Sequence, residues 1–199
     1  WETILQRDTF LDILGRFMHL HVEDKTDPDT GKKTRTQTML FPRYHQWEAV
    51  TALVDTVRAE GPGQKYLIQH SAGSGKTNSI SWLAHRLSVL HDENNKAVFD
   101  SVIVITDRNV LDSQLQEAIR QIEATPGVIA HIAGLGGSKS QELANALSGG
   151  TKIIIVTIQT FPFALDLIQN QAELAGKNFA IIADEAHSSQ AGEASKKLK

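Results

Sequence analysis

The stretch that decides the fold is Ser71-Ala72-Gly73-Ser74-Gly75-Lys76-Thr77, which follows a short apolar run and precedes a helical pattern with an apolar stripe. Its glycines let successive backbone N–H groups point inward at a polyphosphate, and the N-terminus of the next helix adds the positive end of its dipole. Lys76 supplies a point charge for the terminal phosphates, and the Thr77 hydroxyl is a suitable Mg²⁺ ligand. The sequence therefore predicts a nucleotide-phosphate site whose binding residues are Gly73, Ser74, Gly75, Lys76 and Thr77.

One position departs from the usual phosphate-loop pattern. His70 stands where the pattern has a small residue, usually glycine, whereas the tight end from Gly73 to Thr77 is intact. Helicase-type ATPases often relax this position, so the departure concerns the subclass more than the chemistry. The alternative is a flexible Gly/Ser loop that happens to carry a lysine, but the order apolar run, loop, helix favours the phosphate site.

A second candidate half-site follows the apolar run 179–183, where the sequence reads Asp184-Glu185-Ala186-His187. A strand that ends in two carboxylates places Asp184 at the rim of a sheet, where it can hold Mg²⁺ directly or through water. Glu185 can then orient and polarise an attacking water. An acidic pair after a strand is by itself also typical of a solvated loop, and only the phosphate loop makes it specific. His187 is open to three roles, as a metal ligand, a general base or a coupling residue.

The composition and charge of the chain exclude several classes of function. The chain has 199 residues, 41% hydrophobic content, a net charge of −3 and no cysteine, which favours one domain and excludes disulfides, thiolate zinc sites and cysteine nucleophiles. The charge excludes a nonspecific polycation, although a local DNA groove is compatible with it. No apolar run approaches the length of a membrane span and no signal peptide is visible. We expect a cytoplasmic protein, and a piece of a longer polypeptide.

The order of elements predicts an α/β fold, a parallel sheet covered by helices on both faces. Before residue 43 we expect an N-terminal helix and linker segment (1–42), with helical spacing to about residue 20 and then a polar, hairpin-like excursion. From residue 43 to 199 helices and strands alternate, with unbroken β-branched runs that indicate strands buried on both faces. The expected strands are 65–69, 101–106, 128–132, 152–157 and 179–183.

The segments 69–80, 104–111 and 183–190 resemble the R (restriction and motor) subunit of type I restriction-modification enzymes, within the DEAH-like superfamily 2 helicases and translocases. The resemblance runs from about residue 43 to the C-terminus. It implies the first RecA-like lobe of a P-loop NTPase, with ATP and Mg²⁺ as cofactors, and a second lobe beyond residue 199 that supplies arginine fingers. Upstream of residue 43 we find no convincing nuclease constellation.

The resemblance also assigns roles to individual residues. Gln46 would hydrogen-bond adenine while Arg43 or a nearby aromatic packs on the base, although Gln46 could be an ordinary polar residue at a helix N-terminus. Thr106 and Arg108 match the first DNA-contacting motif, and Thr157 and Gln159 resemble the second, with loop capping as the competing interpretation. His187 would couple the ATP state to the neighbouring lobe.

The implied activity is ATP-dependent translocation of double-stranded DNA, coupled to cleavage by a nuclease domain outside this chain. Lys76, Asp184 and Glu185 would be catalytic, and Thr77 and Asp184 would bind the metal. The implied partners are double-stranded DNA and the methyltransferase and specificity subunits of a restriction complex, with no membrane. Three alternatives stay open: another superfamily 2 DNA or RNA helicase, a small-molecule kinase, and a scaffold with a degenerate site.

Overall fold

The computed structural model describes residues 2–26, 28, 30–106, 109–122, 127–132 and 139–184. The elements follow in the order α1 (Arg7–Arg16), β1 (His19–Thr26), β2 (Lys33–Leu40), α2 (Tyr44–Glu60), α3 (Lys76–Ser88), β3 (Ser101–Thr106), α4 (Asn109–Ile122), β4 (Ile129–His131), α5 (Lys139–Ser148), β5 (Ile153–Thr157), α6 (Phe161–Asn170), a 3₁₀ turn η1 (Ala172–Leu174) and β6 (Phe179–Ala183). Within the described ranges we find no helix with both the length and the apolar character needed to cross a bilayer.

The central sheet has the strand order β4-β5-β3-β6, and each neighbouring pair is parallel. In register, Val104 of β3 lies opposite Ile155 on one side and Ile182 on the other. The middle strands β3 and β5 are buried along their whole length, which explains their unbroken β-branched sequences. The predicted parallel sheet is confirmed.

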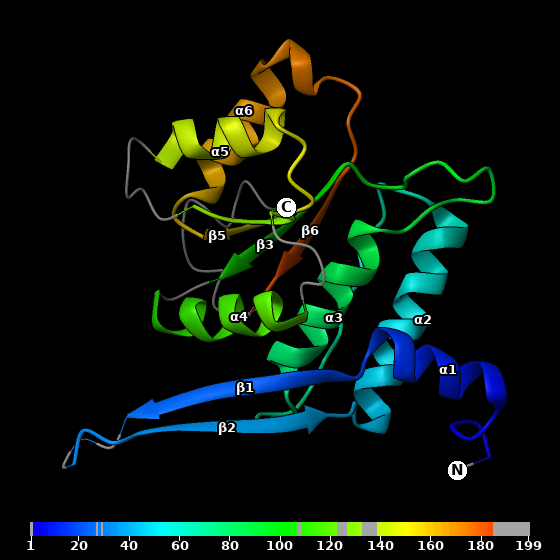
Figure 1. Ribbon diagram of the computed structural model, residues 1–199. Coiled ribbons are helices and arrows are strands. Elements are labelled where there is room, and N and C mark those ends of the chain that lie inside the picture. The colour runs from blue at the N-terminus through cyan, green and yellow to red at the C-terminus, as the bar shows by residue number, and fades with distance from the viewer. Residues whose placement is uncertain are drawn as a thin grey trace.

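Helices cover both faces of this sheet (Figure 1). Alternate side chains of a strand point to opposite faces, so Val102 and Val104 enter a core shared with α2, α3 and α4. Ile103 and Ile105 enter a second core, shared with α5, α6 and η1. The prediction of a doubly covered sheet is therefore confirmed as well.

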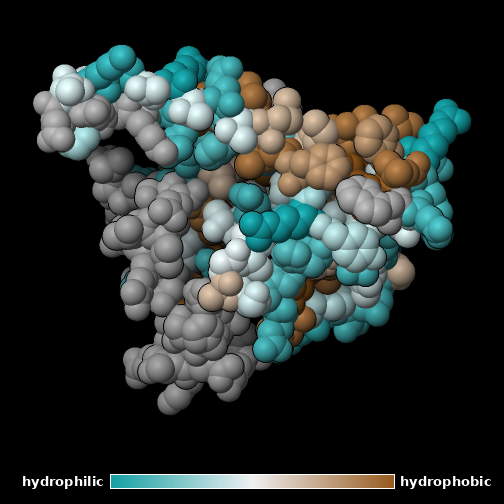
Figure 2. Space-filling view, turned by 90° about the horizontal axis from the view of Figure 1, so that it is seen from below, coloured by the Kyte–Doolittle hydropathy of each residue, from teal (hydrophilic) through white to brown (hydrophobic). Residues whose placement is uncertain are grey.

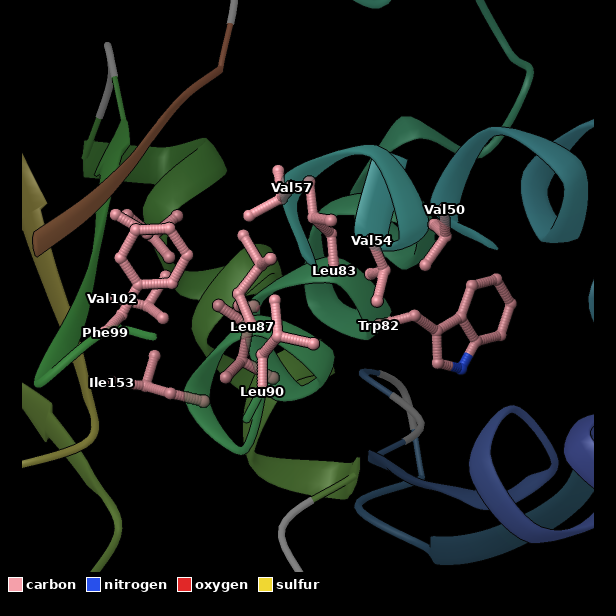
Figure 3. Close-up of a cluster of buried hydrophobic side chains, with 14 of the residues drawn as sticks. Val50, Val54, Val57, Trp82, Leu83, Leu87, Leu90, Phe99, Val102 and Ile153 are labelled. Carbon is pink, nitrogen blue, oxygen red and sulfur yellow. The ribbon is translucent and has the colours of Figure 1, made fainter. Parts of the chain in front are cut away.

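The contact between α2 and α3 forms the larger core and positions the start of α3. One face of α2 and one face of α3 interdigitate and extend to the sheet through side chains that are all buried: Val50, Val54, Val57, Trp82, Leu83, Leu87, Leu90, Phe99, Val102 and Ile153 (Figure 3). Burial of each large side chain of this kind contributes about 1.5–3 kcal/mol. The members of this core that lie on α2 and α3 are spaced with the helical period, which is why the apolar stripes predicted both helices.

The expected strand at 65–69 is wrong. The segment carries no strand assignment, all five residues are exposed, and the Leu67 side chain is 82% exposed. Among the described strands, the sheet ends at β6 and none pairs with this segment. A strand is stable only in a ladder with a neighbour, and the apolar sequence of 65–69 carries no information on whether that neighbour is present.

The N-terminal segment forms a short helix and a long hairpin. Helix α1 ends at Arg16, earlier than the spacing predicts, and Phe17 caps it. Strands β1 and β2 pair antiparallel from His19 opposite Leu40 to Thr26 opposite Lys33, which confirms the hairpin-like excursion. The hairpin runs past α4 (Figure 1), and the Gln121 amide Nε2 of α4 donates to the Val22 carbonyl of β1 at 3.0 Å.

Polar contacts fasten α1 to α3. The Arg86 guanidinium of α3 binds the Asp12 carboxylate at 3.0 Å, and these side chains are only 10% and 21% exposed. Trp82 Nε1 donates to the Phe17 carbonyl at 2.9 Å, and the Arg86 guanidinium lies 5.5 Å from the centre of the Phe17 ring. Burial lowers the pKa of Arg86 from its usual value, and the Asp12 carboxylate opposes that shift. Because Ile13 and Phe17 also enter the larger core, α1 packs onto the lobe.

The same segment carries apolar side chains on its outside. Figure 2 shows the face that lies below in Figure 1, and brown apolar residues gather on one side of it. The large exposed apolar side chains of the first 44 residues are Leu5, Phe10, Leu11, Leu14, Leu20, Met39, Phe41 and Tyr44. The segment thus presents an apolar outer surface in addition to the residues that it contributes to the core.

The contact between α1 and α3 can be tested with Asp12→Ala. The variant leaves the largely buried Arg86 guanidinium without its carboxylate, so we expect a loss of about 1–3 kcal/mol in the free energy of unfolding of the 199-residue chain. Asp24→Ala is the control, because Asp24 and Arg35 form an exposed pair at 3.9 Å. That variant should change the free energy by less than about 0.5 kcal/mol. Equal losses in chemical denaturation would contradict the proposed importance of the buried pair.

The pH dependence of stability gives a second test. Burial lowers the pKa of the His19 ring, the neighbouring His21 adds to the shift, and a hydrogen bond with the Phe17 carbonyl partly opposes it. Between the lowered folded pKa and the unfolded value of about 6.5 the unfolded chain binds more protons, so stability is lost as pH falls through this window. When the pH is lowered from about 7.5 to 5.5, we expect the thermal unfolding midpoint to fall less in His19→Gln than in the parent chain. Identical pH profiles would show that His19 carries none of the effect.

Candidate functional site

The phosphate loop turns through two glycines in the left-handed region of backbone conformation. Gly73 has φ +73° and Gly75 has φ +81°, and Gly75 is the N-cap residue of α3. Lys76 is the first residue of that helix, so the N-terminal end of α3 and the positive end of its dipole lie at the loop. Ser74 is buried, and its hydroxyl has no hydrogen-bond partner among the residues that the structure describes. A buried hydroxyl of this kind suits an anionic ligand with many acceptor oxygens.

The first turn of α2 holds the carbonyl groups of this loop. The Gln46 amide Nε2 donates to the Ser74 carbonyl at 3.2 Å and to the Gly75 carbonyl at 2.9 Å. The His45 ring lies with Nε2 3.1 Å from the same Ser74 carbonyl, and since a carbonyl oxygen only accepts, Nε2 carries the hydrogen. The Ser74 carbonyl oxygen therefore accepts hydrogen bonds from two side chains of α2.

Arg43 extends this contact to the next carbonyl. Its guanidinium Nη1 donates to the Gly73 carbonyl at 3.4 Å, a long bond on an exposed side chain. Its backbone N–H donates to Gln46 Oε1 at 2.9 Å, which caps α2 and fixes the orientation of the Gln46 amide. Donors from three residues of one turn thus hold three successive carbonyls of the loop.

Gly75 is a position where any side chain would collide. A Cβ atom there would lie 2.5 Å from Gln46 Nε2, and φ +81° is in addition a conformation that favours glycine. A side chain at position 75 would therefore displace the Gln46 amide, in addition to the conformational cost of the turn itself.

The structure places Gln46 on the loop. The residue is only 3% exposed, and both hydrogens of its amide are directed at the Ser74 and Gly75 carbonyls. A hydrogen bond from this amide to adenine would replace one of those bonds. Arg43, in contrast, is exposed on the same turn, at the edge of the loop.

Sequence reasoning missed two functional candidates, His45 and His70. The two rings meet edge to face with centroids 5.2 Å apart, and His45 also contacts the Ser74 carbonyl. The departure at position 70 was visible in the sequence as a histidine in place of glycine. Its contact with His45 was not, because the two residues are 25 positions apart on different elements.

The candidate metal ligands lie on one side of the sheet. The Asp184 backbone N–H donates to the Ile105 carbonyl at 3.0 Å, so the chain stays beside β3 for one residue past β6. Figure 1 shows that α3 starts on the side to which the carboxyl ends of β3 and β6 point, and Lys76, Thr77 and Asp184 share this side. Glu185 and His187 lie outside the described residues.

The predicted DNA-contact residues divide into buried and exposed ones. Thr106 and Thr157 are neighbours in the register of β3 and β5 and are 1% and 5% exposed. The Thr157 hydroxyl lies 3.1 Å from the Thr160 hydroxyl, and the Thr106 hydroxyl donates to the Val156 carbonyl at 3.5 Å. Gln159 is exposed, and Arg108 lies outside the described residues. Among the described candidates, Gln159 alone has an exposed side chain.

Comparison with known proteins identifies relatives of this chain. A model of the SWI2/SNF2 ATPase family matches residues 45–199. The type I restriction enzyme HindI endonuclease subunit of Haemophilus influenzae is 31% identical in an alignment of 159 positions, which covers 75% of this chain and 14% of that protein. The putative type I restriction enzyme MjaVIIIP endonuclease subunit of Methanocaldococcus jannaschii is 25% identical in a gapped alignment of 211 positions, which covers 96% of this chain and 19% of that protein. The chain therefore spans less than a fifth of the length of either relative.

The contact between Gly75 and Gln46 generates a prediction for Gly75→Ala. The new methyl group would push Gln46 off the loop, and we expect the affinity for ADP to fall by about tenfold or more. Gly63→Ala is the matched control, since Gly63 also has a left-handed φ of +102°, but no described atom lies within 4 Å of the place that its methyl group would take. That variant should incur the same backbone cost and keep its nucleotide affinity. Equal losses in a titration with fluorescent ADP would mean that backbone strain alone explains the glycine.

Proposed function

Because the chain belongs to the SWI2/SNF2 ATPase family, we propose that it is the first ATPase lobe of the endonuclease subunit of a type I restriction enzyme. The observation that carries the proposal is the phosphate loop at the start of α3, on the side of the sheet where Asp184 follows β6. Two relatives that are endonuclease subunits of such enzymes support the choice within the family. The rest of the subunit, including the second lobe and the nuclease, would lie on other parts of a longer polypeptide.

The residues of the loop fit ATP. Its two left-handed glycines and the first turn of α3 offer backbone amides to a phosphate chain, and the buried Ser74 hydroxyl offers a further donor. Lys76 would pair with the terminal phosphates. The Gly75 position leaves no room for a side chain, which is typical of a backbone that a ligand and a helix approach from two sides.

The Thr77 hydroxyl and the Asp184 carboxylate are hard oxygen ligands and would hold Mg²⁺. A bound ion would neutralise negative charge that develops on the phosphate oxygens. Glu185 would orient the attacking water and accept its proton as the new P–O bond forms and the bond to the ADP oxygen breaks. Lys76 would stabilise the same developing charge from the loop, and a second lobe would supply the arginine fingers.

We propose further that the intact subunit uses this hydrolysis to translocate double-stranded DNA. Gln159, exposed after β5, is the described residue best placed to contact the DNA backbone, with Arg108 as a second candidate. The buried Thr106 and Thr157 would support these loops through their internal hydrogen bonds. Arg43, exposed beside the loop, would pack on the base of the nucleotide, and His187 would couple the ATP state to the second lobe. The subunit would act in a complex with methyltransferase and specificity subunits.

The test of this function is ATP hydrolysis by the intact subunit, with Lys76→Ala and Glu185→Gln as variants. Both should lower DNA-stimulated hydrolysis by about a hundredfold or more, because each removes a group that acts on the transferred phosphoryl. Lys96→Ala, in the exposed loop before β3, is the control and should be fully active. The isolated 199-residue chain should bind nucleotide weakly and hydrolyse it negligibly.

The nucleic acid that stimulates hydrolysis separates this function from its competitor. Stimulation by double-stranded DNA in the presence of the partner subunits supports a restriction motor. Stimulation by RNA or single-stranded DNA alone would support another superfamily 2 helicase instead. Hydrolysis that is unaffected by Lys76→Ala would refute the proposed site altogether.

A further inference from the structure

We propose that His45 is a positioning residue for the phosphate loop and that His70 acts through it. The inference rests on the proposed function, because it concerns how the same loop is held for a phosphate chain. It starts from two contacts: His45 Nε2 lies 3.1 Å from the Ser74 carbonyl, and the His70 ring meets the His45 ring edge to face at 5.2 Å.

The planar peptide explains how a bond to a carbonyl positions an amide. In a trans peptide the C=O of one residue and the N–H of the next point in opposite directions. A donor that draws the Ser74 carbonyl toward α2 therefore turns the Gly75 N–H away from α2. The Gln46 bond to the Gly75 carbonyl turns the Lys76 N–H in the same way. Both amides then face the side on which a phosphate chain would lie, before any ligand arrives.

His45 and Gln46 contribute differently to this arrangement. Gln46 is buried and bonded at both ends of its amide, and the Gly75 carbonyl also accepts from the Asn78 and Ser79 amides of α3. The half-buried His45 ring donates to the Ser74 carbonyl in the middle of the loop, where it adds to the Gln46 bond at 3.2 Å. Loss of the His45 ring would thus loosen the centre of the loop while its connection to α3 stays intact.

His70 gives the His45 ring its orientation. The positive edge of one aromatic ring is attracted to the negative face of another, and such pairs contribute beyond simple burial. His70 lies at the start of the loop and Ser74 at its centre. The two histidine rings therefore connect the start of the loop to its centre. A glycine at position 70, as in the usual pattern, has no ring for this contact. The departure at position 70 and the presence of His45 are therefore explained together.

The main test measures ADP affinity of the 199-residue chain by titration with fluorescent ADP. We expect His45→Ala to weaken binding by about five- to tenfold, the size of one lost hydrogen bond. His45→Gln, whose amide can donate at a similar reach, should recover most of the affinity. His91→Ala is the matched control, since His91 is exposed and its ring contacts only the nearby Val89 carbonyl among the described residues. It should bind ADP as the parent does.

Pyrophosphate separates loop positioning from contact with the base. Pyrophosphate has the phosphate chain and no base, and it can be measured by displacement of fluorescent ADP. If His45 positions the loop, His45→Ala weakens pyrophosphate and ADP by the same factor. A loss confined to ADP would assign His45 to the base and overturn the proposal.

A double-mutant cycle tests the role of His70. We expect His70→Ala to weaken ADP by about two- to threefold, and the pair His45→Ala/His70→Ala to be no weaker than His45→Ala alone. Additive losses would show that His70 acts independently and overturn that part of the proposal.

The outcomes also distinguish this inference from the proposed function. A parent chain that binds ADP through Lys76, with binding unchanged by His45→Ala, would overturn the inference and leave the function standing. A parent that binds neither ADP nor pyrophosphate would count against both. The thermal unfolding midpoint of His45→Ala should equal that of the parent within about 2 °C, and a large fall would assign His45 a structural role instead.

Discussion

An anion site built from backbone amides imposes a constraint on the rest of the backbone, because each amide that faces the ligand leaves a carbonyl facing the protein. Those carbonyls need donors, since a buried and unpaired carbonyl is costly. In this chain the donors come from outside the loop, from Arg43, His45 and Gln46 at the start of α2. The shape of the phosphate loop therefore depends on where α2 begins and how closely it approaches α3.

The packing between α2 and α3 fixes that approach. Valines of α2 and the Trp82 and Leu87 side chains of α3 fill one core (Figure 3). The same two helices bring Gln46 close to Gly75. Helix α1 secures the opposite end of α3 through Asp12 and Arg86. Helix α3 thus contacts both regions: its first residue follows the phosphate loop, and its last turn binds the N-terminal segment.

The structure holds different groups at the predicted ATP-contact and DNA-contact residues. At the loop, one turn of α2 donates hydrogen bonds to the backbone carbonyls of Gly73, Ser74 and Gly75. At the ends of β3 and β5, the hydroxyls of Thr106 and Thr157 are buried and satisfied within the protein, while Gln159 is exposed. A threonine after a strand can support a loop or contact a phosphate, and these two hydroxyls have partners within the protein.

The sequence by itself determined the features that depend on short-range pattern. The strand at 179–183, the two continuous β-branched strands, the helical stripes of α2 and α3 and the glycine turn all follow from residues within one element. They were predictable because side-chain periodicity and glycine conformations are local properties. Membership of the motor family rests on the same local motifs.

Only the tertiary structure decided the features that depend on a neighbour far along the chain. The apolar run 65–69 reads as a strand, yet no described strand pairs with it. The sequence places Gln46 near the N-terminus of a helix, and only the fold shows that its amide binds the carbonyls of a loop nearly thirty residues away. The reason is the same in both cases: hydrogen bonds across the fold are chosen by which groups packing brings within about 3 Å, and a one-dimensional pattern does not contain that distance.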